Sequence, residues 1–124
     1  MLLCHFTAPR SAKAIAASLD REQREKMLGP GVLPAATRRT IVHPVLIRRH
    51  LDCVVAQGVA VSHEEFHLGT AGVAAAVKVP GGLTAAIGCV GACNSSALTR
   101  SSAQVTAAAA GLQRALAVSA RSAY

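Results

Sequence analysis

Two apolar segments joined by a short turn constrain the fold of this chain more than any other feature. Residues 71–79 and 83–90 are rich in Ala, Val, Ile and Leu, and Pro80, Gly81 and Gly82 separate them. Pro and Gly at such a junction are typical of a β-hairpin, because glycine readily adopts the positive φ angles that tight turns need. Alanine itself favours helix, but the Pro-Gly-Gly turn between the two segments favours two antiparallel strands.

The segments on either side of the hairpin predict helices. Ser11 is a candidate cap for the first helix, and Asp20 followed by Gln23 forms a capping-box pattern that opens a short charged helix. Pro44 suits the first turn of a longer helix that Gly58 would end. The expected order is helix 11–19, helix 20–29, helix 44–56, strand 59–61, the hairpin, a loop at 94–96 and a closing helix 99–120. In the third helix the expected apolar stripe is Ile47, Leu51, Val54 and Val55, and in the closing helix it is Val105, Ala109, Leu112 and Leu116.

This order predicts an α/β (α+β) fold in which helices pack on an antiparallel sheet, with residues 1–124 forming one domain. No G-x-G-x-x-G or P-loop pattern accompanies it, which argues against a doubly wound nucleotide-binding fold. Hydrophobic residues make up 52% of the chain and aromatic residues only 2%. The core must therefore use Ala, Val, Leu and Ile. Since small side chains each bury little area, we expect the domain to recruit a second copy.

The formal net charge of +7 raises the question of nucleic-acid binding. The nearest thing to a basic cluster is Arg38, Arg39, Arg48 and Arg49. Direct DNA binding would need basic residues gathered on one face together with a groove-entering element or stacking aromatics. Scattered arginines more often form a solvated surface, and an excess of positive charge suits an acidic small molecule equally well.

The sequence also bears on the cellular compartment. It contains no apolar run long enough to span a bilayer and no evident signal peptide, so a cytoplasmic protein is expected. The four cysteines, at positions 4, 53, 89 and 93, form no C-x-x-C pair, which predicts free thiols. Cys89 lies in an apolar segment and is expected in the core.

Residues 63–67 match H-E-x-x-H, the pattern of zinc peptidases. On a helix it would place His63 and His67 on one face, with Glu64 beside a metal-bound water. Here Gly69 leaves barely one helical turn, and a third ligand would have to come from His43, His50 or Asp52. The preferred interpretation is a polar turn with solvent-facing histidines, and a zinc hydrolase is the weakest of the alternatives.

Five further segments, taken in order, resemble the C-terminal effector-binding domain of IclR-family transcription regulators. Residues 11–15 are similar to the family's S-G-K-A helix start, and residues 37–44 to its T-x-x-T-I-T-D-P segment. Residues 57–65 are similar to G-y-a-x-x-x-E-E. The strands at 73–77, preceded by Gly69, and at 85–91 complete the series.

The resemblance implies a GAF/profilin-like domain that is incomplete at its N-terminus, without the winged helix-turn-helix that such regulators carry. It implies sensing of a small organic or aromatic acid and dimerisation, with DNA bound only indirectly, no catalytic residue, no metal and no cofactor. The partner would be a second copy or an intact relative. The residues expected to contact the effector are Ser11, Ala12, Ser62, Thr70, Gly72, Gly88 and Val90.

Several departures from the family pattern bear on that site. Gly72, Gly88 and Val90 stand where members that bind small carboxylates carry polar side chains, and Ala12 replaces a glycine. The start of the first helix could still offer backbone N–H groups to an anion. Because burying a carboxylate without donors is costly, the resemblance favours an apolar or aromatic acid, and leaves open a ligand-free remnant that serves interaction or dimerisation.

Overall fold

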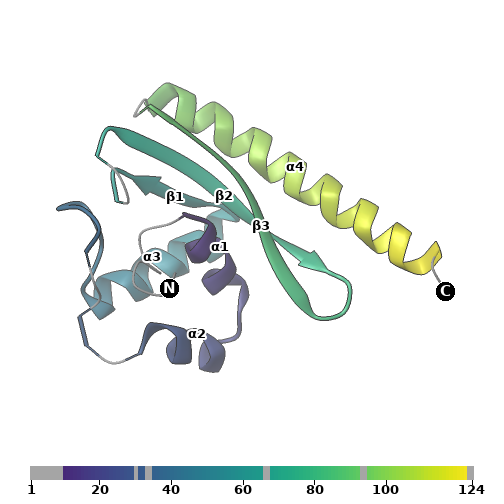
Figure 1. Cartoon of the computed structure of the whole chain (residues 1–124), viewed down its shortest axis with the longest axis horizontal. Coiled ribbons are helices and arrows are strands. Elements are labelled where there is room, and N and C mark those ends of the chain that lie inside the picture. The colour runs from purple at the N-terminus through teal and green to yellow at the C-terminus, as the bar shows by residue number, and fades with distance from the viewer. Residues whose placement is uncertain (1–9, 30, 33–34, 66–67, 93–94, 123–124) are drawn as a thin grey trace.

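A three-stranded sheet separates one long helix from three shorter ones in the computed structural model (Figure 1). The structure describes residues 10–29, 31–32, 35–65, 68–92 and 95–122. The α+β class predicted from the sequence is confirmed. The elements are α1 (Arg10–Ser18), α2 (Arg21–Leu28), α3 (Pro44–Gln57), β1 (Ala60–His63), β2 (Thr70–Val79), β3 (Leu83–Ala92) and α4 (Ser95–Ser122).

The predicted hairpin is confirmed, and it forms the larger part of the sheet. β2 lies between β1 and β3 and is antiparallel to both. The β2–β3 ladder runs from Val79 opposite Leu83 at the turn to Thr70 opposite Ala92 at the far end. Gly81 and Gly82 have φ angles of 94° and 83°, which explains why glycine stands at this junction.

The two faces of β2 pack against different helices. Val73, Ala75 and Val77 form a cluster with Val105 and Ala109 of α4. The alternate residue Ala74 contacts the opposite cluster, together with Ala60 of β1, Ala14 of α1 and Val54 of α3. A third cluster joins the three N-terminal helices through Ala16, Leu28, Ile47 and Leu51. Since β2 is covered on both faces, its apolar residues run continuously instead of alternating with polar ones.

The helix ends show which capping predictions hold. The Asp20 carboxylate accepts a hydrogen bond from the backbone N–H of Gln23 at 2.8 Å, as the capping-box pattern predicts. His43 caps α3 through Nδ1, which accepts from the Val45 N–H at 3.3 Å, and Gly58 ends that helix with a φ of 79°. The predicted cap at Ser11 is wrong, because α1 begins at Arg10 and Ser11 lies inside it.

Three other expectations are wrong in detail. The loop predicted at 94–96 fails at Ser95 and Ser96, which open α4, and serine is well suited to the start of a helix. Val55 is 57% exposed, because the buried face of α3 is centred on Ile47, Leu51 and Val54. Cys89 is exposed as well, since it lies on β3 whereas α4 packs mainly on β2.

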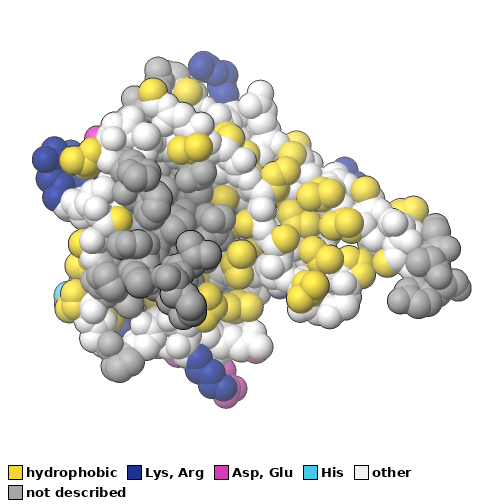
Figure 2. All heavy atoms as spheres, viewed as in Figure 1, with side chains coloured by type: hydrophobic (Ala, Val, Ile, Leu, Met, Phe, Trp, Pro, Cys, Tyr) yellow, Lys and Arg dark blue, Asp and Glu magenta, His cyan; other side chains and the backbone are white. Residues whose placement is uncertain are grey.

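β3 and the distal part of α4 leave apolar side chains in contact with solvent. Leu83 is 66% exposed, Val90 58%, Leu112 42% and Val118 56%. Figure 2 shows such side chains gathered over the hairpin and α4. The expected stripe on α4 is therefore buried at Val105 and Ala109 but open at Leu112. Within the described part of the chain, no helix has the length and apolar character needed to cross a membrane.

The backbone of β2 leaves no room for a side chain at Gly88 of β3. A Cβ atom built on Gly88 would lie 2.4 Å from the backbone oxygen of Val73 and 2.9 Å from the Cβ of Ala74. Backbone atoms cannot move aside as a flexible side chain can, so this contact requires glycine. A Cβ atom built on Gly91, three residues later on the same strand, would have no such neighbour within 4 Å.

We therefore predict that Gly88→Ala lowers the free energy of unfolding by about 1–3 kcal/mol, the usual cost of overpacking. Gly91→Ala, the matched control, should leave it unchanged or slightly raised, because alanine loses less backbone entropy than glycine. Urea denaturation followed by circular dichroism measures both. Equal effects of the two substitutions would show that the close approach at Gly88 does not constrain the hairpin.

Candidate functional site

The five predicted site residues on the strands lie on one face of the sheet, the face that α1 covers. Ser62 of β1 is opposite Gly72 of β2, which is opposite Val90 of β3, so these three form a row. Gly88 belongs to the next row with Ala74, and Thr70 is at the end of β2. Ser62 is 5% exposed and Gly72 is buried, whereas Val90 is 58% exposed. The face is thus closed toward β1 and open toward β3.

The two remaining predicted residues, Ser11 and Ala12, lie in the first turn of α1. α1 packs on all three strands, so this turn belongs to the same side of the sheet. The first N–H groups of a helix have no partner within the helix, and the helix dipole favours negative charge near them. The side chains of Ser11 and Ala12 lie outside the described atoms.

A buried ion pair that was not predicted joins α1 to the end of β1. The Lys13 ammonium donates to Glu65 Oε1, although Lys13 is only 1% exposed and Glu65 5%. The other carboxylate oxygen, Oε2, accepts from the His63 backbone N–H at 3.3 Å. Burial lowers the pKa of Lys13, and the nearby Glu65 charge only partly opposes that effect.

Two threonines hold the turn that carries Glu65. The Thr40 hydroxyl donates to the Glu65 carbonyl and accepts from the backbone N–H groups of Ala36 and Thr37 at 3.0 and 2.9 Å. The Thr37 hydroxyl donates to the Glu64 carbonyl. Thr40 and Glu65 are 25 residues apart in the sequence. The T-x-x-T segment and the E-E segment are nevertheless joined directly by hydrogen bonds.

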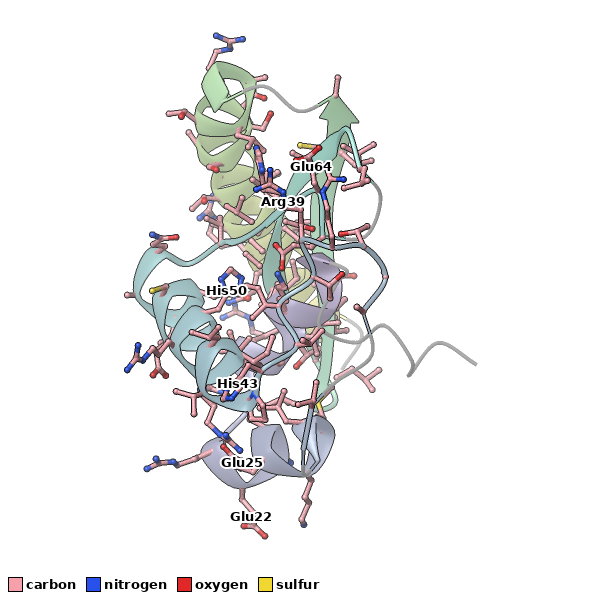
Figure 3. The ribbon with its side chains drawn as sticks, turned by 90° about the vertical axis from the view of Figure 1, so that its left-hand side faces the viewer. Glu22, Glu25, Arg39, His43, His50 and Glu64 are labelled. Carbon is pink, nitrogen blue, oxygen red and sulfur yellow. The ribbon has the colours of Figure 1, made fainter. Side chains whose placement is uncertain are left out.

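The described H-E-x-x-H residues form no helix, and the predicted polar turn is limited to Glu64 and Glu65, of which Glu65 is buried. His63 ends β1 and is exposed, and Glu64 has a φ of 58°. Glu64 Oε1 accepts from the Gly69 N–H at 2.9 Å, which lowers the pKa of the carboxyl. Figure 3 shows Arg39 beside Glu64, and their charged atoms are 3.8 Å apart. His67 lies outside the described residues.

His50, considered above as a possible third zinc ligand, instead points from α3 toward α1 (Figure 3). Among the described residues, no three His, Cys, Asp or Glu side chains gather in a way that could hold a metal ion. His50 Nε2 is buried and has no hydrogen-bond partner in the described structure. Burial, followed by the Lys13 charge, lowers the pKa of His50 from 6.5 to about 4.

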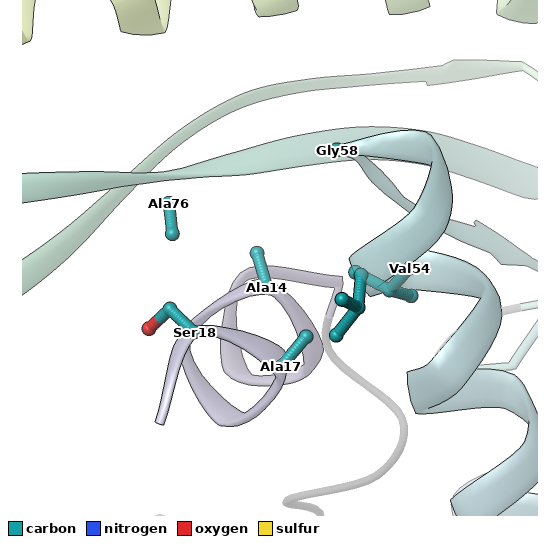
Figure 4. A pocket seen from close by; sticks show the side chains of 7 residues that line it. Ala14, Ala17, Ser18, Val54, Gly58 and Ala76 are labelled. Carbon is teal, nitrogen blue, oxygen red and sulfur yellow. The ribbon is translucent and has the colours of Figure 1, made fainter. Parts of the chain in front are cut away.

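Three hollows surround these elements. A groove of about 210 Å³ between α1, α3 and β2 is lined by Ala14, Val54 and Ala76 among others, but by none of the predicted site residues (Figure 4). A hollow of about 310 Å³ under the first turns of α4 includes Gly72 and Val90. The third lies between charged side chains of α2 and α3, where Arg48 holds both oxygens of Glu25 at 2.8 and 2.7 Å.

Sequence reasoning assigned no role to Lys13, His50 or Glu65 in this site. One signal was present: Lys13 is the one charged residue between Ser11 and Leu19. A lone charge on a small, apolar helix that must pack closely is a candidate for a buried pair. No spacing rule could have pointed to Glu65, since it is 52 residues away in the chain.

The His50 environment predicts a pH effect on stability. Because the pKa is lowered in the folded state, the contribution of neutral His50 is fully present above pH 6.5 and is lost as the pH falls toward 4. His50→Leu should reduce the loss of unfolding free energy between pH 7 and pH 4.5 by about 1–2 kcal/mol, allowing for solvent screening. Denaturation at both pH values measures it, with His63→Gln as the exposed control. An unchanged loss in His50→Leu would contradict the prediction.

Comparison with solved structures shows the same fold in IclR-type regulators. The inducer-binding domain of PobR from Acinetobacter, in complex with 3-hydroxybenzoic acid, superposes with a TM-score of 0.75 at 25% identity, over 87% of this chain and 65% of that one. Thermotoga maritima IclR gives a TM-score of 0.80 at 23% identity, over 90% and 47%. An IclR homologue from Microbacterium hydrocarbonoxydans complexed with 4-hydroxybenzoate gives 0.80 at 22%, over 91% and 46%.

This chain therefore spans about two thirds of the PobR domain and about half of the two longer regulators. No curated protein matches it. The family model for the C-terminal region of bacterial IclR transcriptional regulators matches residues 2–120. The resemblance seen in the sequence is thereby confirmed, and the chain belongs to the IclR C-terminal family of transcriptional regulators.

Proposed function

We propose that this chain is the effector-sensing part of a cytoplasmic transcription regulator. It binds a small organic or aromatic acid on the sheet face covered by α1, and so controls DNA binding by a winged-helix domain located elsewhere. The observation that carries this proposal is the row of Ser62, Gly72 and Val90 on the sheet face that α1 covers. Family membership supports the same role.

The lining of this face favours an acid with an apolar body. Gly72, Gly88 and Val90 present no polar side chain, and Ala74 and Ala86 continue the same face. A flat ring packs well on such a surface, because small residues allow it to approach the strands closely. Two fold neighbours are complexes with 3-hydroxybenzoic and 4-hydroxybenzoic acid, which belong to this class of ligand. The proposed role involves no catalysis, metal or cofactor.

The exposed apolar side chains support self-association. Leu83, Leu112 and Val118 remain accessible on the hairpin and α4, and contiguous apolar surface of this kind marks interaction sites (Figure 2). We propose that the chain dimerises, with its own copy or with a relative. A second candidate function, a dimerisation module that has lost its ligand, is favoured by the missing polar groups at Gly72 and Gly88.

A thermal-shift screen of small aliphatic and aromatic acids against the purified chain tests the leading proposal. We expect aromatic acids to raise the melting temperature, because a ligand that binds only the folded state stabilises it by mass action. Absence of stabilisation by any acid would favour the ligand-free module. Sedimentation velocity distinguishes a dimer from a monomer in the same samples.

Substitutions at two neighbouring exposed residues of β3 test where the ligand binds. Val90 lies on the α1 face of the strand, whereas Cys89 lies on the α4 face. We predict that Val90→Asp weakens binding of 4-hydroxybenzoate about tenfold or more, because a carboxylate there repels the acid and removes apolar contact. Cys89→Asp, with the same added charge, should bind as the unmodified chain does, and isothermal titration calorimetry measures both. Weaker binding in both variants would instead place the ligand in the hollow beneath α4, which Cys89 and Val90 both line.

A further inference from the structure

The Lys13 ammonium has more hydrogen-bonding capacity than the described residues use. It carries three N–H donors, and in the described structure one acceptor faces them, Glu65 Oε1. Lys13 is 1% exposed, so bulk water does not satisfy the other two. Buried donors without partners are rare in folded proteins and often mark the place of a bound molecule. Two donors of a buried cation are thus available to an added acceptor.

A second buried polar atom without a partner among the described residues lies on α3, the helix that packs against α1. His50 Nε2 is buried and accepts or donates no hydrogen bond among the described residues. α1 and α3, which carry Lys13 and His50, pack against each other, and the Lys13 charge helps to lower the pKa of His50. With its proton on Nε2, neutral His50 is a further donor. Both side chains suit a group that accepts several hydrogen bonds, as a carboxylate does.

Glu65 is held independently of Lys13. Its Oε2 accepts from the His63 N–H and its carbonyl accepts from Thr40. An incoming anion would therefore compete with Glu65 for the Lys13 ammonium group, and Glu65 would keep these other hydrogen bonds. Removal of that negative charge should strengthen the binding of an anion to Lys13, whereas the binding of a neutral molecule should change little.

Lys13 is on the β1 side of the sheet face that α1 covers, which is the closed side. Lys13 directly follows Ser11 and Ala12 in the first turn of α1. Its partner Glu65 is hydrogen-bonded to His63, the neighbour of Ser62 in β1. An elongated acid that enters from the open β3 side would have its apolar body over Gly88 and Val90 and its carboxylate near Lys13.

The strand positions supply no other cation for that carboxylate. Gly72, Gly88 and Val90 are apolar, and Lys78, the one cation described on β2, is exposed and donates to the Ser18 carbonyl at 3.2 Å. A buried carboxylate needs a matched donor set to offset its desolvation. We propose that Lys13 is the acid-recognition residue of the effector site, and that the Glu65 carboxylate occupies its ammonium group when no effector is bound. This inference rests on the proposed function and specifies its ligand as a monocarboxylic acid.

Calorimetric titration with 4-hydroxybenzoate and its neutral analogue 4-hydroxybenzamide tests the assignment. The two variants are Glu65→Gln, which keeps the shape and removes the competing charge, and the double variant Lys13→Met with Glu65→Gln. The double variant removes both members of the pair, so no unpaired buried charge is left to unfold the chain. Circular dichroism establishes that each variant is folded.

We expect the unmodified chain to bind the acid more tightly than the amide. Glu65→Gln should raise the affinity for the acid about tenfold and leave that for the amide within about twofold. The double variant should lose the preference for the acid, a change of about 10- to 100-fold, as befits the loss of a charged hydrogen bond. A purely structural role of the pair would shift both probes equally.

The contrary results are distinct. A folded double variant that still prefers the acid overturns the assignment of Lys13. An unchanged acid affinity in Glu65→Gln overturns the role of Glu65 as a competing occupant. If the unmodified chain binds neither probe, the proposed effector site on the α1 face is itself wrong, and the inference falls with it.

Discussion

The contact between Lys13 and Glu65 connects two parts of this structure that are 52 residues apart in the chain. It ties the first turn of α1 to the turn after β1, and the Thr37–Thr40 segment holds that turn from the other side. Removing one partner of a buried pair leaves an uncompensated charge, whereas replacing both is often tolerated. The position of α1 over the sheet, and hence the shape of the candidate site, therefore depends on this long-range contact as well as on the apolar packing of Ala14 and Ala16.

The small residues of the sheet make that arrangement possible. Alanine and glycine on the α1 face of β2 and β3 bring helix and strands close together, as the packing of Ala14 on Ala60 and Ala74 shows. Each such contact buries little apolar area. Helix and strands thus lie close together, but the packing energy between them is modest. The stability of the fold therefore depends more on the buried polar cluster, and on what covers the exposed apolar surface, than it would in a domain with an aromatic core.

The features that the sequence predicts well are local. The β2–β3 hairpin follows from Pro80, Gly81 and Gly82, and the start of α2 follows from Asp20, because each depends on residues a few positions apart. The strand residues that motif order predicts for the site share one face of the sheet, as the ladder register shows. What escaped prediction depends on packing between distant elements. Cys89 is exposed because β3 receives little cover from α4, and Glu65 is buried because Lys13 meets it from 52 residues away. No periodicity encodes either fact.

The outer edge of β3 affects how this chain associates in solution. Its ten residues, Leu83–Ala92, carry no charge and no proline, and in the described structure only β2 pairs with them. Charged residues and prolines are the usual protection of a free strand edge, whose unpaired N–H and C=O groups otherwise template the growth of further sheet. Self-association of the chain should therefore rise steeply with protein concentration unless another segment covers this edge. A segment that covers this edge would also shield the sheet face beside it from a second chain.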